Sequence, residues 1–366
     1  MTPIPCEARL LDLVTYENGM DMQQRLVGHR QKGEVPDQIL LLQHTPVITL
    51  GRGGRISNLL ASTSQLESKG VRYFETNRGG DITYHGPGQI VGYPILHLGE
   101  GNRDVRKFVT KLEEVLIRTA AEYGIEATRS EGARGVWVGS RKLAAIGVRI
   151  ARWVTSHGFA LNVSTNLDHF SLITPCGLPG TGVTSIDQIT GAKNSLEEVR
   201  MVVLRHFARV FERELFLRDP DLDVVKVVVH DNDRVLLLHR TQENGANWQP
   251  VTGTVEEGED FEGAARRELI EEIGHDLPVE DLGMQQSFAI DPVYLRSEDR
   301  RSVVVFARER AFTARMARDL PVRVSPEEHD AAGWFTFQDA YGRLRWSDDR
   351  EAVQRVEQTL RGRLVS

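Results

Sequence analysis

The clearest helical periodicity lies in residues 194–215, NSLEEVRMVVLRHFARVFEREL, where apolar residues recur every three or four positions. Ser195 and Glu198 open this stretch with the spacing of a capping box. A second stretch of the same period covers residues 103–124 and ends at Gly124, a residue type that often terminates helices. The pattern predicts two amphipathic helices with these buried residues: Leu196, Val199, Val203, Phe207, Val210 and Phe211 in one, and Val105, Phe108, Leu112, Val115 and Leu116 in the other.

Apolar runs with β-branched residues predict strands in two regions of the chain. The first region holds runs at 38–50, 88–98, 135–150 and 156–163, which alternate with helices and indicate an α/β or α+β sheet domain. After the segment FLRDPDLD, VVKVVVHDNDRVLLLHR is typical of a hairpin that turns at Asp231-Asn232-Asp233. The change of pattern predicts two domains, residues 1–216 and 217–366.

Composition narrows the class of protein. Among 366 residues, 40% are hydrophobic and 27% charged, as in globular proteins. The net charge of −7 gives no electrostatic reason to expect nucleic acid as a partner. No apolar run reaches the roughly 18 residues of a membrane span, so we expect no membrane association. We expect a cytoplasmic protein whose thiols stay reduced.

The second domain carries a cluster of carboxylates on one predicted helix, FEGAARRELIEEI, whose inward residues would be Ala264, Ala265, Leu269, Ile270 and Ile273. Glu268, Glu271 and Glu272 follow the i, i+3, i+4 spacing that gathers side chains on one side of a helix. Three carboxylates repel one another unless a cation joins them, and Mg²⁺ takes such hard oxygen ligands. The spacing therefore indicates a site that binds a metal and a diphosphate, to which Gly253 can add a backbone carbonyl. A solvated acidic helix face is the alternative.

The segment GTVEEGEDFEGAARRELIEEIG, residues 253–274, resembles the Nudix box, Gx5Ex7REUxEExGU, where U is apolar. Glu259, Arg267 and Gly274 are in register with the three carboxylates, and we expect Glu259 and Arg267 to hold the loop onto the helix. Only His275 departs from the pattern, at a packing position. The resemblance implies an α/β/α sandwich that hydrolyses a nucleoside diphosphate linked to another moiety, with Mg²⁺ or Mn²⁺ as cofactor. The alternative is a nucleotide-sensing module that regulates the first domain.

Segments around the box resemble Nudix pyrophosphatases that act on dihydroneopterin triphosphate or deoxynucleoside triphosphates. These segments are NWQPVTGTVEEGE, EEHDAAGWFTF (with Glu328, His329 and Trp334) and LRWSDDREAV. The resemblance implies a nucleoside or pterin triphosphate as substrate. Trp248 and Trp334 would be core residues or base-stacking residues.

In the first domain, Cys176 lies in ITPCGLPGTG and is one of two cysteines. A disulfide with Cys6 is disfavoured in the cytoplasm, and no CxxC or CxxH spacing indicates zinc. A buried small residue and a nucleophilic thiol remain as alternatives, whereas Cys6 begins a predicted strand and has no assigned role. Lys142, after a turn at Gly139-Ser140, would lower the pKa of the Cys176 thiol if the two residues met.

Four segments in this domain follow the order and spacing of lipoyl(octanoyl) transferases: RGGDITYHGPGQIVGYPI, GVWVGSRKLAAIGVRI, SHGFALNV and ITPCGL. The resemblance covers residues 6–212 and implies the mixed sheet with flanking helices of biotin and lipoate ligases. It implies that Cys176 carries an acyl thioester, that Lys142 lowers its pKa, and that no cofactor is needed. It also implies an acyl-binding site formed by Arg78, Gly79, Gly80, Asp81, Ile82, Thr83, Tyr84, His85, Ala145, Ile146, Gly147, Gly158, Phe159 and Ala160.

The implied reaction moves octanoyl from octanoyl-acyl carrier protein to the lysine of lipoyl domains, those of 2-oxoacid dehydrogenases and of the glycine cleavage protein. His85 and His157 would orient the thioester or the acceptor lysine, or simply be hydrogen-bonded in the core. The Gly-Arg run TLGRGGRISN leaves one alternative, an ATP-dependent lipoate ligase. We interpret the chain as an octanoyltransferase joined to a Nudix hydrolase.

Overall fold

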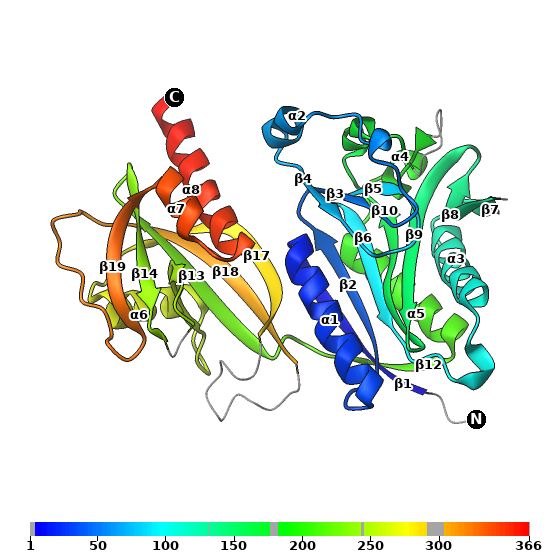
Figure 1. Cartoon of the computed structure of the whole chain (residues 1–366), viewed down its shortest axis with the longest axis horizontal. Coiled ribbons are helices and arrows are strands. Elements are labelled where there is room, and N and C mark those ends of the chain that lie inside the picture. The colour runs from blue at the N-terminus through cyan, green and yellow to red at the C-terminus, as the bar shows by residue number, and fades with distance from the viewer. Residues whose placement is uncertain (1–3, 131, 176–181, 243–244, 291–303, 366) are drawn as a thin grey trace. The chain divides into compact units, whose positions relative to one another are not determined.

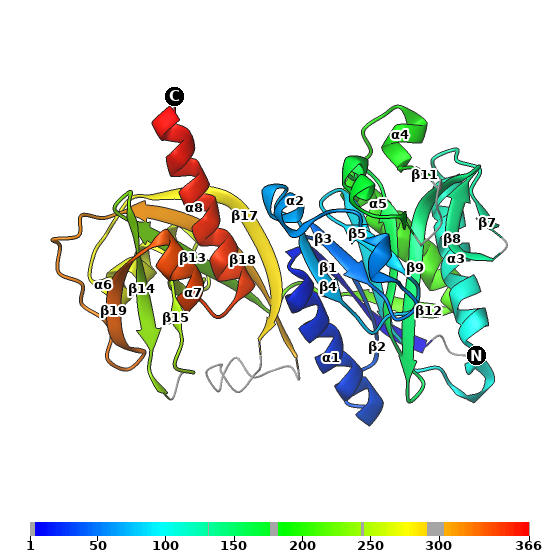
Figure 2. The same ribbon diagram turned by 45° about the horizontal axis from the view of Figure 1, so that its top comes forward.

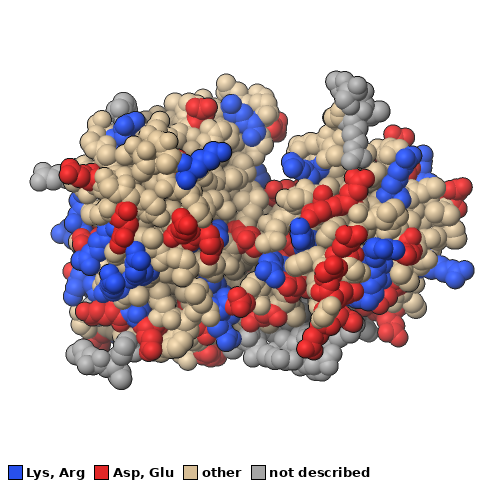
Figure 3. Space-filling model, turned by 180° about the vertical axis from the view of Figure 1, so that it is seen from behind, with Lys and Arg blue, Asp and Glu red and all other residues tan. Residues whose placement is uncertain are grey.

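The computed structural model describes residues 4–130, 132–175, 182–242, 245–290 and 304–365. Contacts divide the chain into two compact units, Met1–Asp219 and Pro220–Ser366, and the division falls within the FLRDPDLD segment. Each unit is a mixed sheet with helices (Figures 1 and 2). Basic and acidic side chains are interspersed over the face seen in Figure 3. Among the described residues, no helix combines the length and apolar character needed to cross a membrane.

The main sheet of the first unit has the strand order β12-β1-β2-β6-β10-β9-β8-β7, and β11 adds to β9. A small sheet of order β4-β3-β5 accompanies it. The strands are β1 (Ile4–Val14), β2 (Asp37–His44), β3 (Val47–Leu50), β4 (Arg72–Glu75), β5 (Ile82–His85), β6 (Gln89–Ile95), β7 (Thr128–Ser130), β8 (Ala133–Val138), β9 (Arg141–Ala151), β10 (Val154–Asn162), β11 (Gly182–Val183) and β12 (Arg213–Leu217).

Helices complete the first unit and cover its sheet. α1 packs against β6 and β10, whereas α3 and α5 pack against each other and share one hydrophobic cluster with the strands. Their bounds are α1 (Tyr16–Lys32), α2 (Thr63–Ser68), α3 (Val105–Ala121), α4 (Ile186–Thr190) and α5 (Leu196–Phe211), with 3-10 turns η1 (Ile56–Asn58), η2 (Glu100–Asn102) and η3 (Leu167–Leu172).

The second unit is an α/β/α sandwich. Its sheet has the order β15-β14-β13-β18-β17, with β16 beside β13 and β19 beside β14. One hydrophobic cluster joins the sheet to α6, and another joins it to α7 and α8. The elements are β13 (Leu222–His230), β14 (Arg234–Arg240), β15 (Trp248–Gln249), β16 (Val251–Thr254), α6 (Phe261–Ile273), β17 (Val279–Ile290), β18 (Val305–Arg315), β19 (His329–Thr336), α7 (Phe337–Arg343) and α8 (Ser347–Val365).

Several expected elements form as the pattern predicts. The 231–233 turn joins β13 to β14, with Asn232 at φ 93°, and α6 spans the expected helix. Asp260 caps α6 by accepting from the Gly263 amide, and Gly274 ends it at φ 83°. The expected Gly139-Ser140 turn joins β8 to β9, with Gly139 at φ 57°.

Other expectations are wrong in part. The helix expected to reach residue 215 ends at Phe211, because the next residues form β12 and pair in parallel with β1. The strand expected over 38–50 is divided between the main sheet and the small sheet. Val105 and Ile270 were expected to face inward, but their side chains are 49% and 50% exposed.

Candidate active sites

A cavity of about 340 Å³ lies in the first unit, between strands β6, β9 and β10 on one side and the segment 78–85 on the other. The segment is fixed to β9 because the Gly79 amide donates to the Val148 carbonyl at 3.0 Å. Close packing there depends on glycine, since a Cβ on Gly147 would lie 2.7 Å from the Gly79 carbonyl oxygen. The cavity is thus built where strands and a glycine loop approach closely.

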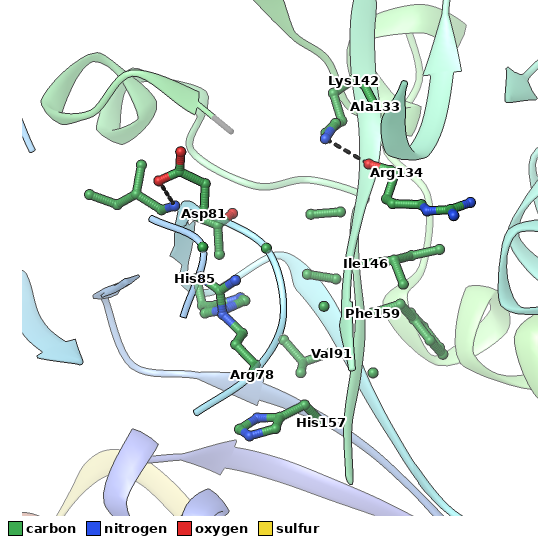
Figure 4. Close-up of a pocket in the computed structure, with 18 of the residues that line it drawn as sticks. Arg78, Asp81, His85, Val91, Ala133, Arg134, Lys142, Ile146, His157 and Phe159 are labelled. Carbon is green, nitrogen blue, oxygen red and sulfur yellow. Dashed lines mark hydrogen bonds between the residues drawn. The ribbon is translucent and has the colours of Figure 1, made fainter. Parts of the chain in front are cut away.

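The walls and the ends of the cavity differ in polarity. Its apolar lining includes Val91, Ala145 and Ala160, whereas the side chains of Ile146 and Phe159, which also border it, pack in the hydrophobic cluster that the sheet shares with α3 and α5. Figure 4 shows Lys142 and Arg134 toward one end and Arg78 and His157 toward the other. An unbranched acyl chain with a polar head fits this division, because the apolar wall removes methylenes from water while the polar end receives the head.

Most of the expected acyl-binding residues line this cavity. The lining contains Arg78, Gly80, Asp81, Ile82, Thr83, His85, Lys142, Ala145, Ile146, Gly147, Gly158, Phe159 and Ala160. Gly79 does not line it and lies beside Val148. Tyr84 does not line it either, since it is buried in a separate core and its hydroxyl lies 2.7 Å from His169 Nδ1. Cys176 lies outside the described residues.

Lys142 is held in a fixed position at the cavity. Lys142 is 5% exposed, its Nζ donates to the Arg134 carbonyl at 2.9 Å, and the same nitrogen lies 4.6 Å from the centre of the Trp137 ring. Gly135 makes room for it, because a Cβ there would lie 3.3 Å from Lys142 Cε and 2.5 Å from the Ala144 carbonyl. Neighbours on β8 therefore position the amine.

Two described segments lie next to Lys142 on either side of residues 176–181. Pro175 and Lys142 both line a smaller cavity of about 10 Å³. On the far side, Val183 pairs with Lys142 in β9, and the Thr184 amide donates to the Lys142 carbonyl at 3.0 Å. The chain on both flanks of this stretch is thus anchored beside the lysine.

The histidines of the cavity are neutral and hydrogen-bonded. Burial lowers the pKa of His85 to about 3, and its Nδ1 lies 2.8 Å from Gln89 Oε1. Burial and the Arg78 charge lower the pKa of His157 to about 3, and its Nε2 lies 2.8 Å from Asn77 Oδ1. Both rings can orient a ligand without carrying charge near neutral pH.

Arg78 brings a nearly buried positive charge to the cavity. It donates to the Thr49 carbonyl at 2.7 Å and to the Thr49 hydroxyl at 2.9 Å. These bonds fix the orientation of the guanidinium, a group that stays charged in proteins. Gln89 and Tyr93 also lie in the cavity region. The sequence analysis assigned them no role, although both lie in the segment RGGDITYHGPGQIVGYPI.

In the second unit, Glu268 and Glu272 of α6 are nearly buried, whereas Glu271 is exposed. Burial raises the pKa of Glu268 to about 7 against the opposing charge of Arg267, and it raises the pKa of Glu272 well above its usual value. Within the described parts of the chain, neither Glu272 oxygen accepts a hydrogen bond of normal geometry. Such orphaned buried acceptors fit a bound cation.

Arg267 ties the preceding loop to the helix. Its Nη2 donates to the Thr254 carbonyl at 2.7 Å and to Glu259 at 3.1 Å, and its Nη1 donates to Glu268 at 2.7 Å. Gly253 lies against the Glu268 carboxylate, because a Cβ there would lie 1.8 Å from it. Only glycine at position 253 therefore allows the backbone to lie this close to the Glu268 carboxylate.

Two further ligand atoms approach Glu272 from the segment that begins β19. Oxygen and nitrogen atoms of Glu272, Glu328 and His329 lie within 4.8 Å of one another, close enough to share an ion. His329 is fully buried and its Nε2 lies 3.9 Å from Glu272 Oε1. The donor set of carboxylates and one imidazole fits a divalent metal.

Comparison with known proteins matches each unit to a family. The lipoyl protein ligase A/B catalytic domain model matches residues 15–208, and the NUDIX domain model matches residues 220–356. The chain therefore belongs to the lipoyl protein ligase A/B family and carries a NUDIX domain.

An octanoyltransferase of Myxococcus xanthus is 41% identical over 356 residues, which cover 94% of this chain and 97% of that protein. This similarity over nearly the whole chain places it among the octanoyltransferases. An octanoyltransferase of Solibacter usitatus is 52% identical over 57% of this chain and 94% of its own length. Among solved structures, lipoate-protein ligase A bound with ATP is 15% identical with a TM-score of 0.48, covering 58% of this chain and 90% of that chain. The E. coli dihydroneopterin triphosphate pyrophosphohydrolase is 28% identical with a TM-score of 0.31, covering 36% of this chain and 92% of that chain.

Proposed function

We propose that the first unit transfers octanoyl from octanoyl-acyl carrier protein to the lysine of lipoyl domains through a thioester on Cys176. The observation that carries this proposal is the position of Lys142. It borders both the apolar cavity and the smaller cavity lined by Pro175, the residue that precedes Cys176 in the sequence. An amine there can accept the thiol proton while the acyl chain occupies the apolar walls.

The reaction balances in two steps. In the first, the Cys176 sulfur attacks the donor thioester carbonyl, its proton passes to the Lys142 amine, and the carrier leaves as a thiol after taking that proton. In the second, the amine of the lipoyl-domain lysine attacks the Cys176 thioester, an amide forms, and the sulfur leaves. The excess proton of the amine passes through Lys142 back to the sulfur, and no cofactor is consumed.

Affinity for the chain follows from burial of methylenes. The six methylenes of an octanoyl group, at about 0.8 kcal/mol each, give about 5 kcal/mol of transfer free energy. Shortening the chain by two carbons should therefore weaken binding of the acyl group by about tenfold.

Intact mass measurement tests the thioester. Incubation with octanoyl-acyl carrier protein should add one octanoyl group to the chain, and Cys176→Ala should abolish the addition. Cys6→Ala is the matched control, because Cys6 is fully buried in the core and burial raises the pKa of its thiol. An adduct that survives in Cys176→Ala, or octanoylation of a lipoyl domain that requires ATP, would contradict the proposal.

We also propose that the second unit hydrolyses a nucleoside or pterin triphosphate with Mg²⁺ or Mn²⁺. Glu268, Glu272 and the Gly253 carbonyl would hold the metal, with Glu271 at the exposed side of the helix. The metal would bind the phosphates and lower the pKa of an attacking water. The retained carboxylates favour catalysis over nucleotide sensing.

A screen of triphosphates with Mg²⁺ tests this activity, with Glu272→Gln as the inactive variant. Tight binding without turnover, accompanied by a changed transferase rate, would instead support the sensing role. Both reactions use cytoplasmic substrates, and we assign the protein to the cytoplasm.

A further inference from the structure

Buried polar atoms without hydrogen-bonding partners gather at one end of the sheet in the second unit. Within the described residues they include Arg240 Nε, Asn247 Nδ2 and both ring nitrogens of His329. Both carboxylate oxygens of Glu272 belong to the same group, since the Thr252 amide approaches them without normal hydrogen-bond geometry. Buried donors and acceptors are nearly always paired, so a group of unpaired ones indicates a ligand that completes them.

The backbone brings these residues together on the face of the sheet that carries α6. Arg240 ends β14, its amide donates to the Asn247 carbonyl at 3.0 Å, and it pairs with His329 of β19. Leu236 and Leu238 of β14 pack in the cluster that contains α6, and strand alternation gives Arg240 the same face. Electrostatic interaction of Arg240 with both Glu272 and His329 agrees with this placement.

A metal ion alone would not complete this group. It would satisfy the carboxylate oxygens of Glu272, but Arg240 Nε and Asn247 Nδ2 are N–H donors and cannot ligate a cation. Both donors need an acceptor, and the charge of the guanidinium favours an oxygen-rich anion such as phosphate, whose oxygens it matches in geometry. An anion that satisfies the donors and also bridges to a metal on Glu272 is a phosphate chain.

We propose that Arg240 and Asn247 bind the phosphate chain of the substrate opposite the metal-binding carboxylates of α6. This assignment rests on the proposed hydrolase function and makes the substrate a polyphosphate ester. The donors hold non-bridging oxygens, and the carboxylates hold the metal on the same chain. Substrates would then be selected first by their phosphates.

Two binding measurements on the full chain test the assignment. Mn²⁺ binding, followed by electron paramagnetic resonance, reports the carboxylate site alone. Binding of inorganic triphosphate in the presence of Mn²⁺, followed by calorimetry, reports the phosphate donors. Arg240→Gln and Asn247→Ala should each weaken triphosphate binding by about ten- to a hundredfold, as expected for a lost hydrogen bond to a charged group, and should leave Mn²⁺ binding unchanged.

Arg234→Gln is the matched control, because Arg234 begins the same strand and its Nη1 donates to the Trp334 carbonyl at 3.4 Å, on a residue distant in sequence from the carboxylates of α6. It should bind triphosphate like the unaltered protein. Equal triphosphate binding in all three variants, or a loss of Mn²⁺ binding in Arg240→Gln, would overturn the assignment. If triphosphate binds in an Arg240-dependent way but no triphosphate is hydrolysed, the phosphate site stands and the hydrolase proposal fails.

Discussion

Replacing Lys226 by methionine should destabilise the second unit more than any surface change. Lys226 is 1% exposed on β13, and its Nζ lies 2.8 Å from carboxylate oxygens of Glu309, Asp348 and Asp349. Removing one partner of a buried ion pair costs about 3–5 kcal/mol, because the remaining charge is left buried without compensation. Here three carboxylates would remain, so we expect a loss near the upper end of that range at pH 8.

The loss of stability caused by Lys226→Met should be smaller at low pH, because the carboxyl pKa values of the cluster are raised. Burial raises the pKa of Glu309 to about 7 and raises that of Asp349, against the opposing charge of Lys226. A carboxyl with a raised folded-state pKa binds more protons folded than unfolded, so its contribution to stability falls as pH rises from about 4.5 to 7. Without Lys226 these two pKa values rise further, so at pH 5 the Glu309 and Asp349 carboxyls are neutral.

Urea unfolding at pH 5 and at pH 8, followed by tryptophan fluorescence, measures the loss of stability at each pH. Glu309→Gln is the matched control, because it removes one charge of the same cluster and leaves Lys226 an oxygen to bind. It should cost less than about 1 kcal/mol at either pH, as a neutral amide oxygen remains. The reasoning is refuted if Lys226→Met costs the same at pH 5 as at pH 8, or no more than Glu309→Gln.

Three further predictions concern the two sites. Gly253→Ala places a Cβ 1.8 Å from the Glu268 carboxylate, so it should lower hydrolase turnover at least tenfold. Acyl transfer should be unchanged, and assays of both activities on one preparation will check this. Gly135→Ala, at φ 124° and against Lys142, should slow formation of the octanoyl adduct tenfold or more in quenched-flow mass measurements; an unchanged rate would contradict the role of Lys142. Because burial lowers the pKa of His85 to about 3, its contribution to stability is lost as pH falls from about 6.5 toward 3, so the first unit should weaken in acid, as calorimetric melting at pH 4 and pH 7 will show.

The second site was predictable from local sequence to an unusual extent. The limits of α6, its caps and the contact of Arg267 with Glu259 all arise within 22 consecutive residues, 253–274. The spacing of the glutamates along α6 alone determines which carboxylates lie on the same side of the helix. The orphaned donors Arg240 and Asn247 were not predictable, because only the pairing of β14 with its neighbouring strands brings them near α6.

Tertiary pairing overrode several local patterns in the first unit. The last residues of the helix expected over 194–215 form β12 instead, because pairing with β1 outweighs helical periodicity there. Tyr84 was expected at the acyl site, yet the period of two along β5 puts Thr83 and His85 on the cavity side and the Tyr84 ring in the other core. A glycine- and histidine-rich segment therefore identifies the site but not which of its side chains face it.

Glycine has the same physical role in both sites, although only one instance was visible in the sequence. Gly253 lets the backbone approach Glu268, and the motif spacing made this position stand out. Gly135 gives Lys142 its space in the same way, but its φ of 124° and its contact with Ala144 appear only when β8 and β9 pair. At Gly253 an added Cβ would meet only the Glu268 side chain among its nearest neighbours, so its substitution should displace the carboxylate. At Gly135 the Cβ would meet the Ala144 carbonyl at 2.5 Å as well as Lys142 Cε at 3.3 Å, so its substitution should strain the pairing of β8 with β9 while it displaces the amine.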